Sequence, residues 1–328
     1  MEYNNLAVVG ATGAVGREMQ KIIEERDFPF ENLKLIATEK SAGKIFNING
    51  KEYKVEKFKP GVFKDVDIAL FSIGSGASKK LVPQAVKEGA VVIDNSNAFR
   101  MDKNVPLIVP EINPEEIDNH NGIIANPNCS TIQMVMVLKP IYNLAGIKRI
   151  VVSTYQAVSG TGKAAIDELD QQVRDYVDND ELKSDIYPHQ IAFNILPHID
   201  VFFEDGYTRE EMKMVKETRK ILADDNLAIT ATAARVPVFY GHSEAVNIEV
   251  EKDISIAQLK EAIRKTEGVK IIEKYPVTIM TEHDDNVLVG RIRRDNSIDC
   301  GFNLWVVANN LRKGAALNAV QIAEKLIK

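Results

Sequence analysis

The chain has 328 residues, of which 45% are hydrophobic and 27% charged, and its formal net charge is −6. A chain of this length buries a sizeable core and is expected to hold two domains. The acidic balance and the absence of a long basic block argue against nucleic acid as the main partner, and two cysteines are too few for a disulfide framework. There is no apolar run of transmembrane length, and Met1 to Asn5 carry no basic leader, so we expect a cytoplasmic protein.

A short apolar strand at residues 6–9 leads into a glycine-rich turn and then into a helical pattern. This order is typical of a dinucleotide-binding unit, because glycines let the backbone approach a pyrophosphate whose charge the helix N-terminus stabilises. The spacing is G-x-x-G-x-x-G rather than the commoner G-x-G-x-x-G, so a plain tight turn stays an alternative. The residues expected to bind the cofactor here are Gly10, Thr12, Gly13, Ala14 and Val15.

The next strand, residues 33–37, ends in a loop that bears on the choice of cofactor. Glu39 could accept a hydrogen bond from a ribose 2′-hydroxyl, whereas Lys40, Ser41 and Lys44 supply donors that suit a 2′-phosphate. We therefore predict NADP, with Lys40 and Ser41 as ligands. The alternative is that these lysines are merely solvated.

Two further strands, residues 67–71 and 91–94, end in polar turns, and a helix is predicted over residues 77–87. Alternating strands and helices predict a parallel, doubly wound sheet, whose ligands bind beyond the carboxyl ends of the strands. Ser72, Gly74 and Asn95 follow those ends and are expected to face the cofactor. Arg100 either binds an anion or is an ordinary surface arginine.

Cys129 follows a strand at residues 123–125 and a Pro/Asn turn, and precedes a helical pattern at residues 132–144. A cysteine at a helix N-terminus is stabilised as the thiolate, which is a nucleophile. A thiol near a nicotinamide indicates aldehyde oxidation through a thiohemiacetal and a thioester. The alternative is that Cys129 is a small buried hydrophobic residue.

The second half begins with a strand over residues 149–155, which ends in a faintly phosphate-loop-like stretch, residues 156–163. That stretch lacks the P-loop pattern, which argues against nucleoside triphosphate hydrolysis. The next helix carries an apolar stripe that indicates core or a subunit interface. His189 and His198 lie at no familiar metal spacing, so no metal site is expected.

A helix is predicted to begin at Thr208, with Glu210 and Lys213 three residues apart on one face, where a surface salt bridge is the simplest interpretation. Residues 228–234 read as a strand that leads to Arg235 and then to His242. A histidine there either shuttles protons for a thiol or is structural.

Five motifs together resemble the aspartate-β-semialdehyde dehydrogenase family, in its bacterial-type branch. They are residues 10–16, Asn126-Pro127-Asn128-Cys129-Ser130-Thr131, the Gln156 loop, residues 235–244 and Asn310-Leu311-Arg312-Lys313-Gly314-Ala315-Ala316. The resemblance runs from the first strand to the last helix. It implies a fold similar to glyceraldehyde-3-phosphate dehydrogenase, in class α/β: a Rossmann-type NADP-binding domain, residues 1–128 plus 311–328, and an α+β catalytic and dimerisation domain, residues 129–310.

The resemblance also implies roles for individual residues. Cys129 matches the acyl-thioester nucleophile, His242 the acid/base, and Gln156 the residue that orients the substrate. Arg235 matches the binder of the substrate α-carboxylate and Glu210 the partner of its amino group, with Asn128 also at the substrate. The phosphate site is matched by Arg100 and Lys213, and the remaining cofactor contacts by Ser159, Gly160, Asn309 and Asn310. Asn309 stands where many family members have Asp.

The implied reaction interconverts aspartate 4-semialdehyde, phosphate and NADP⁺ with 4-aspartyl phosphate and NADPH, in the pathway to lysine, threonine and methionine. A homodimer is expected, with the segment from Asp167 to Asp180 as its interface. Two alternatives stay open: another acyl-phosphate reductase, such as the N-acetyl-glutamyl-phosphate reductases, and a catalytically silent nucleotide-binding homologue.

Overall fold

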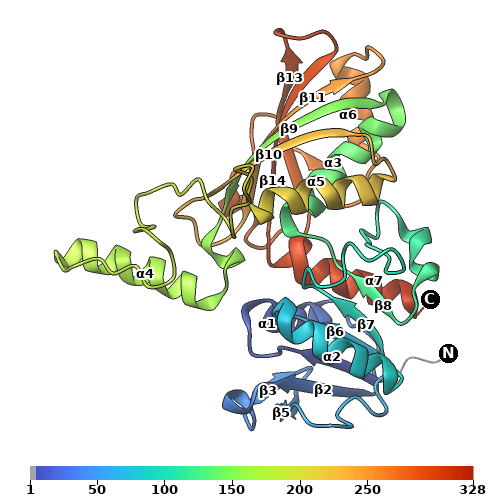
Figure 1. Ribbon diagram of the computed structural model, residues 1–328, viewed down its shortest axis with the longest axis vertical. Helices are drawn as coiled ribbons and strands as arrows, with labels where there is room; N and C mark the ends of the chain where they lie inside the picture. Colours follow the sequence, from blue (N-terminus) through green and yellow to red (C-terminus); the bar gives the residue numbers. More distant parts are fainter. Residues whose placement is uncertain (1–4, 328) are drawn as a thin grey trace. The chain divides into compact units, whose positions relative to one another are not determined.

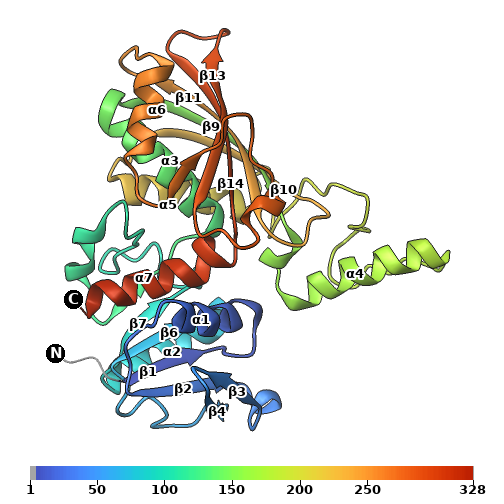
Figure 2. The ribbon, with the colours of Figure 1, turned by 180° about the vertical axis from the view of Figure 1, so that it is seen from behind.

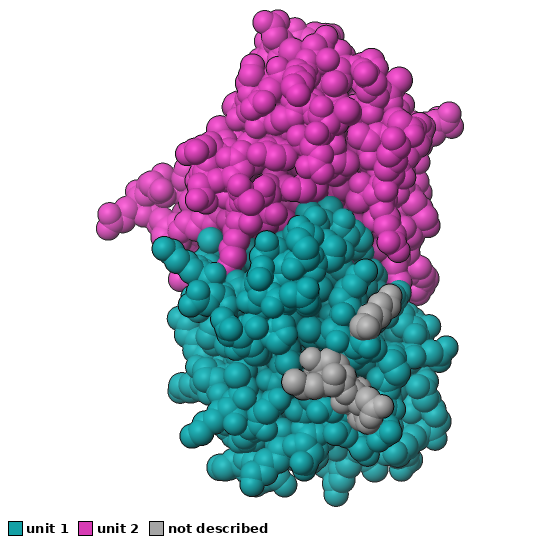
Figure 3. All heavy atoms as spheres, turned by 90° about the vertical axis from the view of Figure 1, so that its right-hand side faces the viewer, with its two compact units in different colours: residues 1–128, 315–328 teal, residues 129–314 magenta. Residues whose placement is uncertain are grey.

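The computed structural model describes residues 5–327, so the expectation drawn from Met1 to Asn5 falls almost wholly outside the described residues. The chain divides into two compact units (Figure 3). Unit 1 comprises residues 1–128 and 315–328, and unit 2 comprises residues 129–314. Between residues 5 and 327, no helix is long and apolar enough to cross a membrane.

Unit 1 is built on a parallel sheet of six strands in the order β5-β2-β1-β6-β7-β8 (Figure 1). The strands are β1 (Asn5–Val9), β2 (Asn32–Ala37), β5 (Glu56–Lys57), β6 (Ile68–Phe71), β7 (Val91–Asp94) and β8 (Ile123–Ala125). All four residues of β6 are buried, which is typical of a parallel strand covered on both faces. The predicted doubly wound sheet is confirmed.

Helices cover both faces of this sheet (Figure 2). They are α1 (Ala14–Glu25) and α7 (Leu317–Leu326) on one face and α2 (Ser75–Lys87) on the other. The hairpin β3 (Ile45–Ile48) and β4 (Lys51–Lys54) and the short helices η1 (Glu39–Ser41) and η2 (Pro114–Asn119) complete unit 1. The amphipathic pattern of the sequence predicts the last helix from about Leu311, but α7 begins at Leu317, because a π-helical turn (η5, Arg312–Ala316) precedes it.

Unit 2 is built on a mixed six-stranded sheet in the order β10-β9-β11-β14-β13-β12. Its strands are β9 (Ile147–Gln156), β10 (Ala228–Arg235), β11 (His242–Val250), β12 (Val269–Ile271), β13 (Val287–Asp295) and β14 (Gly301–Ala308). Its helices are α3 (Cys129–Ala145), α4 (Lys163–Asp178), α5 (Arg209–Leu222) and α6 (Ile256–Arg264), with short turns η3 (Val158–Gly160) and η4 (Thr278–Thr281). The apolar pattern of residues 298–308 predicts a strand from residue 298, but β14 begins at Gly301, because Cys300 lies in a turn with φ +54°.

One face of the unit 2 sheet is covered by α3, α5 and α6, which between them contact all six of its strands. Along β11 the burial alternates from Glu244 onward, and Val246, Ile248 and Val250 are the buried members of the series. Helix α4 instead extends away from the sheet of its own unit, in Figure 1 as in Figure 2. The sheet therefore has one packed face, and the polar residues at its edge are fixed by that packing.

Candidate active site

The glycine-rich turn of unit 1 is packed too tightly for any side chain at two positions. A Cβ on Gly10, which has φ +84°, would lie 2.2 Å from the Ser72 carbonyl oxygen. A Cβ on Gly16 would lie 2.2 Å from the Gly10 carbonyl oxygen. Gly13 caps α1 without any side-chain hydrogen bond, so the first N–H groups of α1, at Ala14 and Val15, suit a pyrophosphate.

The loop after β2 is held against this turn. The Thr12 hydroxyl donates to the Ser41 hydroxyl at 3.1 Å, which brings the two predicted cofactor segments together. Glu39 accepts a hydrogen bond from Lys57 at 2.6 Å, and Lys40 lies beside Ser41 in the short helix η1. The acid is thus already paired with a cation, which favours a phosphate over a ribose hydroxyl as the group received here.

A chain of amides joins the carboxyl ends of β6, β7 and β8. Asn95 donates to the Phe71 carbonyl at 2.8 Å and accepts from Asn126 at 2.9 Å. Asn318 of α7 donates in turn to Asn126 at 2.7 Å. Arg100 donates to the Asn95 carbonyl at 2.7 Å, so the predicted anion-binding arginine is folded back onto the turn that carries Asn95.

The remaining predicted residues of unit 1 lie at the same carboxyl ends. Ser72 follows β6 and donates its N–H to the Val9 carbonyl at 2.8 Å. Gly74 caps α2, and Asn128, which is buried, directly precedes α3.

Asp94, the last residue of β7, is a buried acid at this edge that the sequence did not single out. It accepts hydrogen bonds from the Ser96 hydroxyl at 2.7 Å and from the Ser78 hydroxyl at 3.1 Å. Burial raises the pKa of Asp94, against the opposing effect of these hydrogen bonds. The carboxyl therefore fixes the turn after β7.

In unit 2, three predicted residues meet at one edge of the sheet because of strand register. Gln156 and Arg235 are the last residues of the parallel neighbours β9 and β10 and are register partners. His242 is the first residue of β11, which runs antiparallel to β9. All three side chains are buried.

The backbone of Ala157 aligns two of these side chains. Its N–H donates to Nδ1 of His242 at 3.0 Å, and its carbonyl accepts from Nη1 of Arg235 at 2.7 Å. Because Nδ1 accepts a hydrogen bond, the neutral imidazole carries its proton on Nε2. Within residues 5–327, that Nε2 has no hydrogen-bond partner. Burial, and then the Arg235 guanidinium, lower the pKa of His242 to about 3, so the ring is neutral at physiological pH.

Gly160 packs closely against the two groups. A Cβ built on Gly160 would lie 3.0 Å from Nη1 of Arg235 and 3.3 Å from Nε2 of His242. The guanidinium and the imidazole N–H therefore lie close to each other on one side of this residue. Such a pair of donors suits the oxygens of a compound that carries a carboxylate and a carbonyl group.

Glu210 and Lys213, in the first turn of α5, form the ion pair considered above, with 2.9 Å between Oε2 and Nζ. The other Glu210 oxygen accepts from Nε2 of Gln156 at 3.2 Å. Gln156 also accepts from the Thr154 hydroxyl at 3.1 Å. Lys213 has a second carboxylate partner, Asp200, at 3.0 Å. The pair is therefore part of a network that reaches Gln156.

Cys129 is the first residue of α3 and is partly exposed. Gly314 packs directly against it, since a Cβ on Gly314 would lie 2.9 Å from the Cys129 Cβ. One turn further along α3, the Gln133 carboxamide donates to the His242 carbonyl at 3.5 Å. The second turn of α3 thus lies against the start of β11, and the predicted nucleophile has the helix position that favours a thiolate.

Of the other predicted cofactor residues, three use their side chains within the chain. Ser159 and Asn310 are hydrogen-bonded to each other, and Asn310 also accepts from the Gly241 N–H at 2.8 Å. Asn309 donates to the Thr281 carbonyl at 3.0 Å and accepts from the Leu311 N–H at 3.0 Å. In this structure these side chains hold the loops that flank His242.

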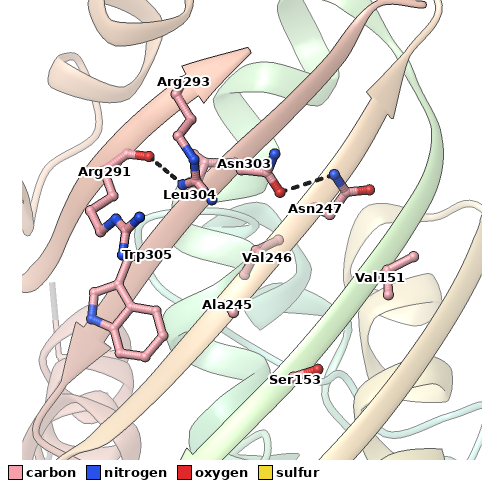
Figure 4. A pocket seen from close by; sticks show the side chains of 10 residues that line it. All are labelled: Val151, Ser153, Ala245, Val246, Asn247, Arg291, Arg293, Asn303, Leu304 and Trp305. Atoms are coloured by element: carbon pink, nitrogen blue, oxygen red, sulfur yellow. Dashed lines mark hydrogen bonds between the residues drawn. The ribbon is translucent and has the colours of Figure 1, made fainter. Parts of the chain in front are cut away.

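A separate pocket of about 300 Å³ lies on the sheet of unit 2 (Figure 4). Its polar lining includes Arg291, Arg293, Asn247 and Asn303, beside Trp305. None of the predicted site residues lines it. Its β11 residues Ala245 and Asn247 alternate with the buried residues of that strand, so it opens on the face that α3, α5 and α6 leave uncovered.

Two family models match the chain. Residues 5–120 match "Semialdehyde dehydrogenase, NAD binding domain", and residues 138–313 match "Semialdehyde dehydrogenase, dimerisation domain". The chain belongs to the semialdehyde dehydrogenase family. This confirms the resemblance drawn from the sequence. It also confirms that the chain has a domain of the type that binds a nicotinamide cofactor.

Similar semialdehyde dehydrogenases match over nearly their full length. The chain is 56% identical to the aspartate-semialdehyde dehydrogenase of Aquifex aeolicus and 51% identical to that of Legionella pneumophila. The matches cover 98% of this chain in both cases, and 98% and 95% of the relatives. A crystal structure of aspartate semialdehyde dehydrogenase II from Vibrio cholerae, complexed with ASA, has a TM-score of 0.97 and 48% identity, covering 100% of this chain and 99% of that one.

A more distant semialdehyde dehydrogenase structure bears on the cofactor. It is that of aspartate semialdehyde dehydrogenase with NADP from Candida albicans, at 25% identity and a TM-score of 0.78, covering 99% of this chain and 98% of that one. The predicted α/β architecture, with a Rossmann-like unit and a second, dimerisation domain, is confirmed by these comparisons.

Proposed function

We propose that the chain is an NADP-dependent, phosphorylating aspartate-semialdehyde dehydrogenase. It interconverts 4-aspartyl phosphate and aspartate 4-semialdehyde in the pathway to lysine, threonine and methionine. The observation that carries the proposal is that a buried guanidinium, that of Arg235, and a buried neutral imidazole, that of His242, converge beside Gly160. From there the first can bind the carboxylate of a short substrate and the second can donate a proton to its reacting oxygen. The identity of about half to the relatives named above supports the same substrate.

The charges of the site match those of the substrate. Arg235 binds the α-carboxylate, because a guanidinium offers paired donors to a carboxylate. Glu210 accepts the amino group, and Lys213 and Arg100 bind phosphate, with Asn128 beside the substrate. Gln156 is held by Thr154 and Glu210 and orients the substrate.

Cys129 carries the covalent step. In the biosynthetic direction its thiolate attacks the acyl carbonyl, the C–O bond to phosphate breaks, and a thioester remains on the sulfur. His242 presents the proton on Nε2 to the oxygen on which negative charge develops, a contribution typically worth about 3 kcal/mol per donor. Nε2 is also the atom through which His242 would serve as the predicted acid/base.

The residues of unit 1 fit a dinucleotide. The tight turn at Gly10 and Gly16 and the uncapped start of α1 suit the pyrophosphate. Lys40, Ser41 and Thr12 receive the 2′-phosphate, which supports NADP over NAD. When bound, NADPH supplies the hydride that reduces the thioester. Ser72, Gly74 and Asn95 complete the proposed site in unit 1, and Ser159, Gly160, Asn309 and Asn310 contribute from the loops of unit 2.

The test is reduction of NADP⁺ by aspartate semialdehyde, with and without phosphate, for the wild type and Cys129→Ala. We expect phosphate-dependent turnover that the variant loses while its thermal midpoint is kept. A wild type that binds NADP but turns over nothing would favour a silent homologue. Turnover of N-acetyl-glutamyl semialdehyde instead would favour the other acyl-phosphate reductase, which the relatives' names do not support.

We also propose a homodimer, to which α4 contributes. Val173, Tyr176 and Val177 on this helix are 36%, 59% and 71% exposed, although the sequence predicts them on one apolar stripe with the buried Leu169. A matched dimerisation model over residues 138–313 supports this. Light scattering should give twice the chain mass, and Val177→Asp should shift it toward a monomer. A monomeric wild type at working concentration contradicts the proposal.

A further inference from the structure

The Lys213 ammonium lies between two carboxylates. Nζ is 2.9 Å from Oε2 of Glu210 and 3.0 Å from Oδ2 of Asp200. The side chains of Lys213 and Glu210 are only 18% and 7% exposed, so these contacts are poorly screened by solvent. Burial alone would lower the pKa of Lys213, but Glu210 and Asp200 outweigh it and the pKa is raised. Lys213 is therefore an ammonium that both acids hold.

Asp200 is fixed in the position from which it reaches Lys213. Its Oδ1 accepts the Val201 N–H at 2.9 Å and lies 3.5 Å from Nη1 of Arg209. Its backbone has φ +68°, the left-handed region that few residues other than glycine adopt. The backbone and both neighbours thus fix Oδ1, and the second oxygen, Oδ2, points at the lysine.

The second carboxylate beside Lys213 matters when the substrate's amino group binds. Under the proposed function, Glu210 must accept the substrate's amino group while it already binds Lys213. Two ammonium groups on one carboxylate repel each other. Asp200 supplies the second carboxylate, so that each ammonium has its own partner.

We propose that Asp200 is a positioning residue that holds Lys213 and thereby frees Glu210 for the substrate's amino group. It sets the preference of the site for 4-oxo acids that carry an α-amino group over those that lack one. The role rests on the proposed function, in which Glu210 meets that amino group. Gln156 donates to the other Glu210 oxygen, so it does not compete with Lys213 for Oε2.

The experiment compares Asp200→Asn with the wild type on two substrates, aspartate semialdehyde and 4-oxobutanoate, which lacks the amino group. The variant keeps the shape of the side chain but removes its charge, so Lys213 stays on Glu210 and competes with the substrate. We expect the ratio of the two kcat/KM values to fall about five- to tenfold, through a higher KM for aspartate semialdehyde. Turnover of 4-oxobutanoate should change little. If 4-oxobutanoate reacts too slowly, its inhibition constant against aspartate semialdehyde gives the comparison.

Asp205→Asn is the matched control, since Asp205 lies in the same segment and caps the Tyr207 N–H at 3.1 Å. Its substrate ratio should equal that of the wild type. In a Lys213→Met background, Asp200→Asn should no longer change the ratio, because the competing ammonium is gone. Lys213→Met also removes a proposed phosphate ligand and should slow both substrates alike, so the ratio of their kcat/KM values should still show the preference for the amino substrate. This test holds even if Asp200→Asn does not fold.

Two results would overturn the role of Asp200. One is an active Asp200→Asn variant with the wild-type substrate ratio, and the other is a Lys213→Met variant whose ratio falls. Either leaves the proposed function intact. A wild type without turnover of aspartate semialdehyde refutes the proposed function itself, and the role of Asp200 with it.

Discussion

Replacing Gly160 by alanine tests whether the substrate binds at Arg235 and His242. The added methyl carbon would lie 3.0 Å from Nη1 of Arg235 and 3.3 Å from Nε2 and Cε1 of His242. The φ of Gly160 is outside the left-handed region, so alanine fits the backbone there. The methyl therefore pushes against the groups proposed to bind the substrate without requiring a new main-chain conformation.

The expected loss of kcat/KM in Gly160→Ala follows from how far the methyl moves the groups around it. A carbon contact of 3.0 Å is several tenths of an ångström too short, so the guanidinium must shift and the substrate group must lie elsewhere. Misplacement of about 1 Å costs about 100-fold in rate, and we expect kcat/KM for aspartate semialdehyde to fall by that factor. The strain of an extra methyl in a packed site is about 1–3 kcal/mol, so the fold should survive.

The assay is NADP⁺ reduction at saturating phosphate, together with a thermal unfolding curve. Gly76→Ala in α2 is the matched control, since a Cβ there meets no atom within 4 Å. It should keep full activity. If Gly160→Ala has a kcat/KM within twofold of the wild type, turnover does not depend on the placement of Arg235 and His242, and their assignment fails.

Three other predictions concern stability. Burial raises the pKa of Glu244 well above its usual value, against a smaller effect of Gln133. The folded state thus holds a proton that the unfolded chain releases above its pKa of about 4.5, and stability falls as pH rises from there toward the folded pKa. Glu244→Gln should raise the thermal midpoint at pH 8 by about 2–4 °C and leave it unchanged at pH 4. A variant whose midpoint equals that of the wild type at pH 8 as well would contradict this. Gly10→Ala should cost more than about 3 kcal/mol in urea unfolding, because it combines a forbidden contact with a left-handed backbone, and a loss below about 1 kcal/mol would be inconsistent with the packing. Thr208→Ala removes a capping box and should cost about 1 kcal/mol in the same assay, whereas unchanged stability would show that the cap contributes nothing.

Much of the fold could be predicted because local signals agree with tertiary structure. The strand, glycine turn and helix at residues 6–16 form as the sequence indicates, and the cap at Thr208 lies where its hydroxyl and the following acids predict. The apolar stripe of α4 was equally readable. However, periodicity alone cannot say whether a stripe packs inside the chain, and most of it is exposed here.

The candidate site was predictable only where a motif marks its residues. Asp200 lies in an irregular segment without periodicity, and only the fold brings it to Lys213. The partner of His242 could not be predicted from the sequence for another reason. It is the backbone N–H of Ala157, a group that every residue except proline has. Similarly, the late start of α7 reflects a π-helical turn at residues 312–316, and helical periodicity does not distinguish such a turn from α-helix.

The backbone of Ala157 makes the site tolerant of substitutions at this residue. The separation of Arg235 from His242 is set by one N–H and one carbonyl, which side-chain replacement at residue 157 leaves untouched. Only proline would remove the N–H that His242 accepts. The main chain thus fixes the position of Arg235, the proposed carboxylate binder, relative to His242, the proposed proton donor. Side chains around them can be replaced without a change in this spacing.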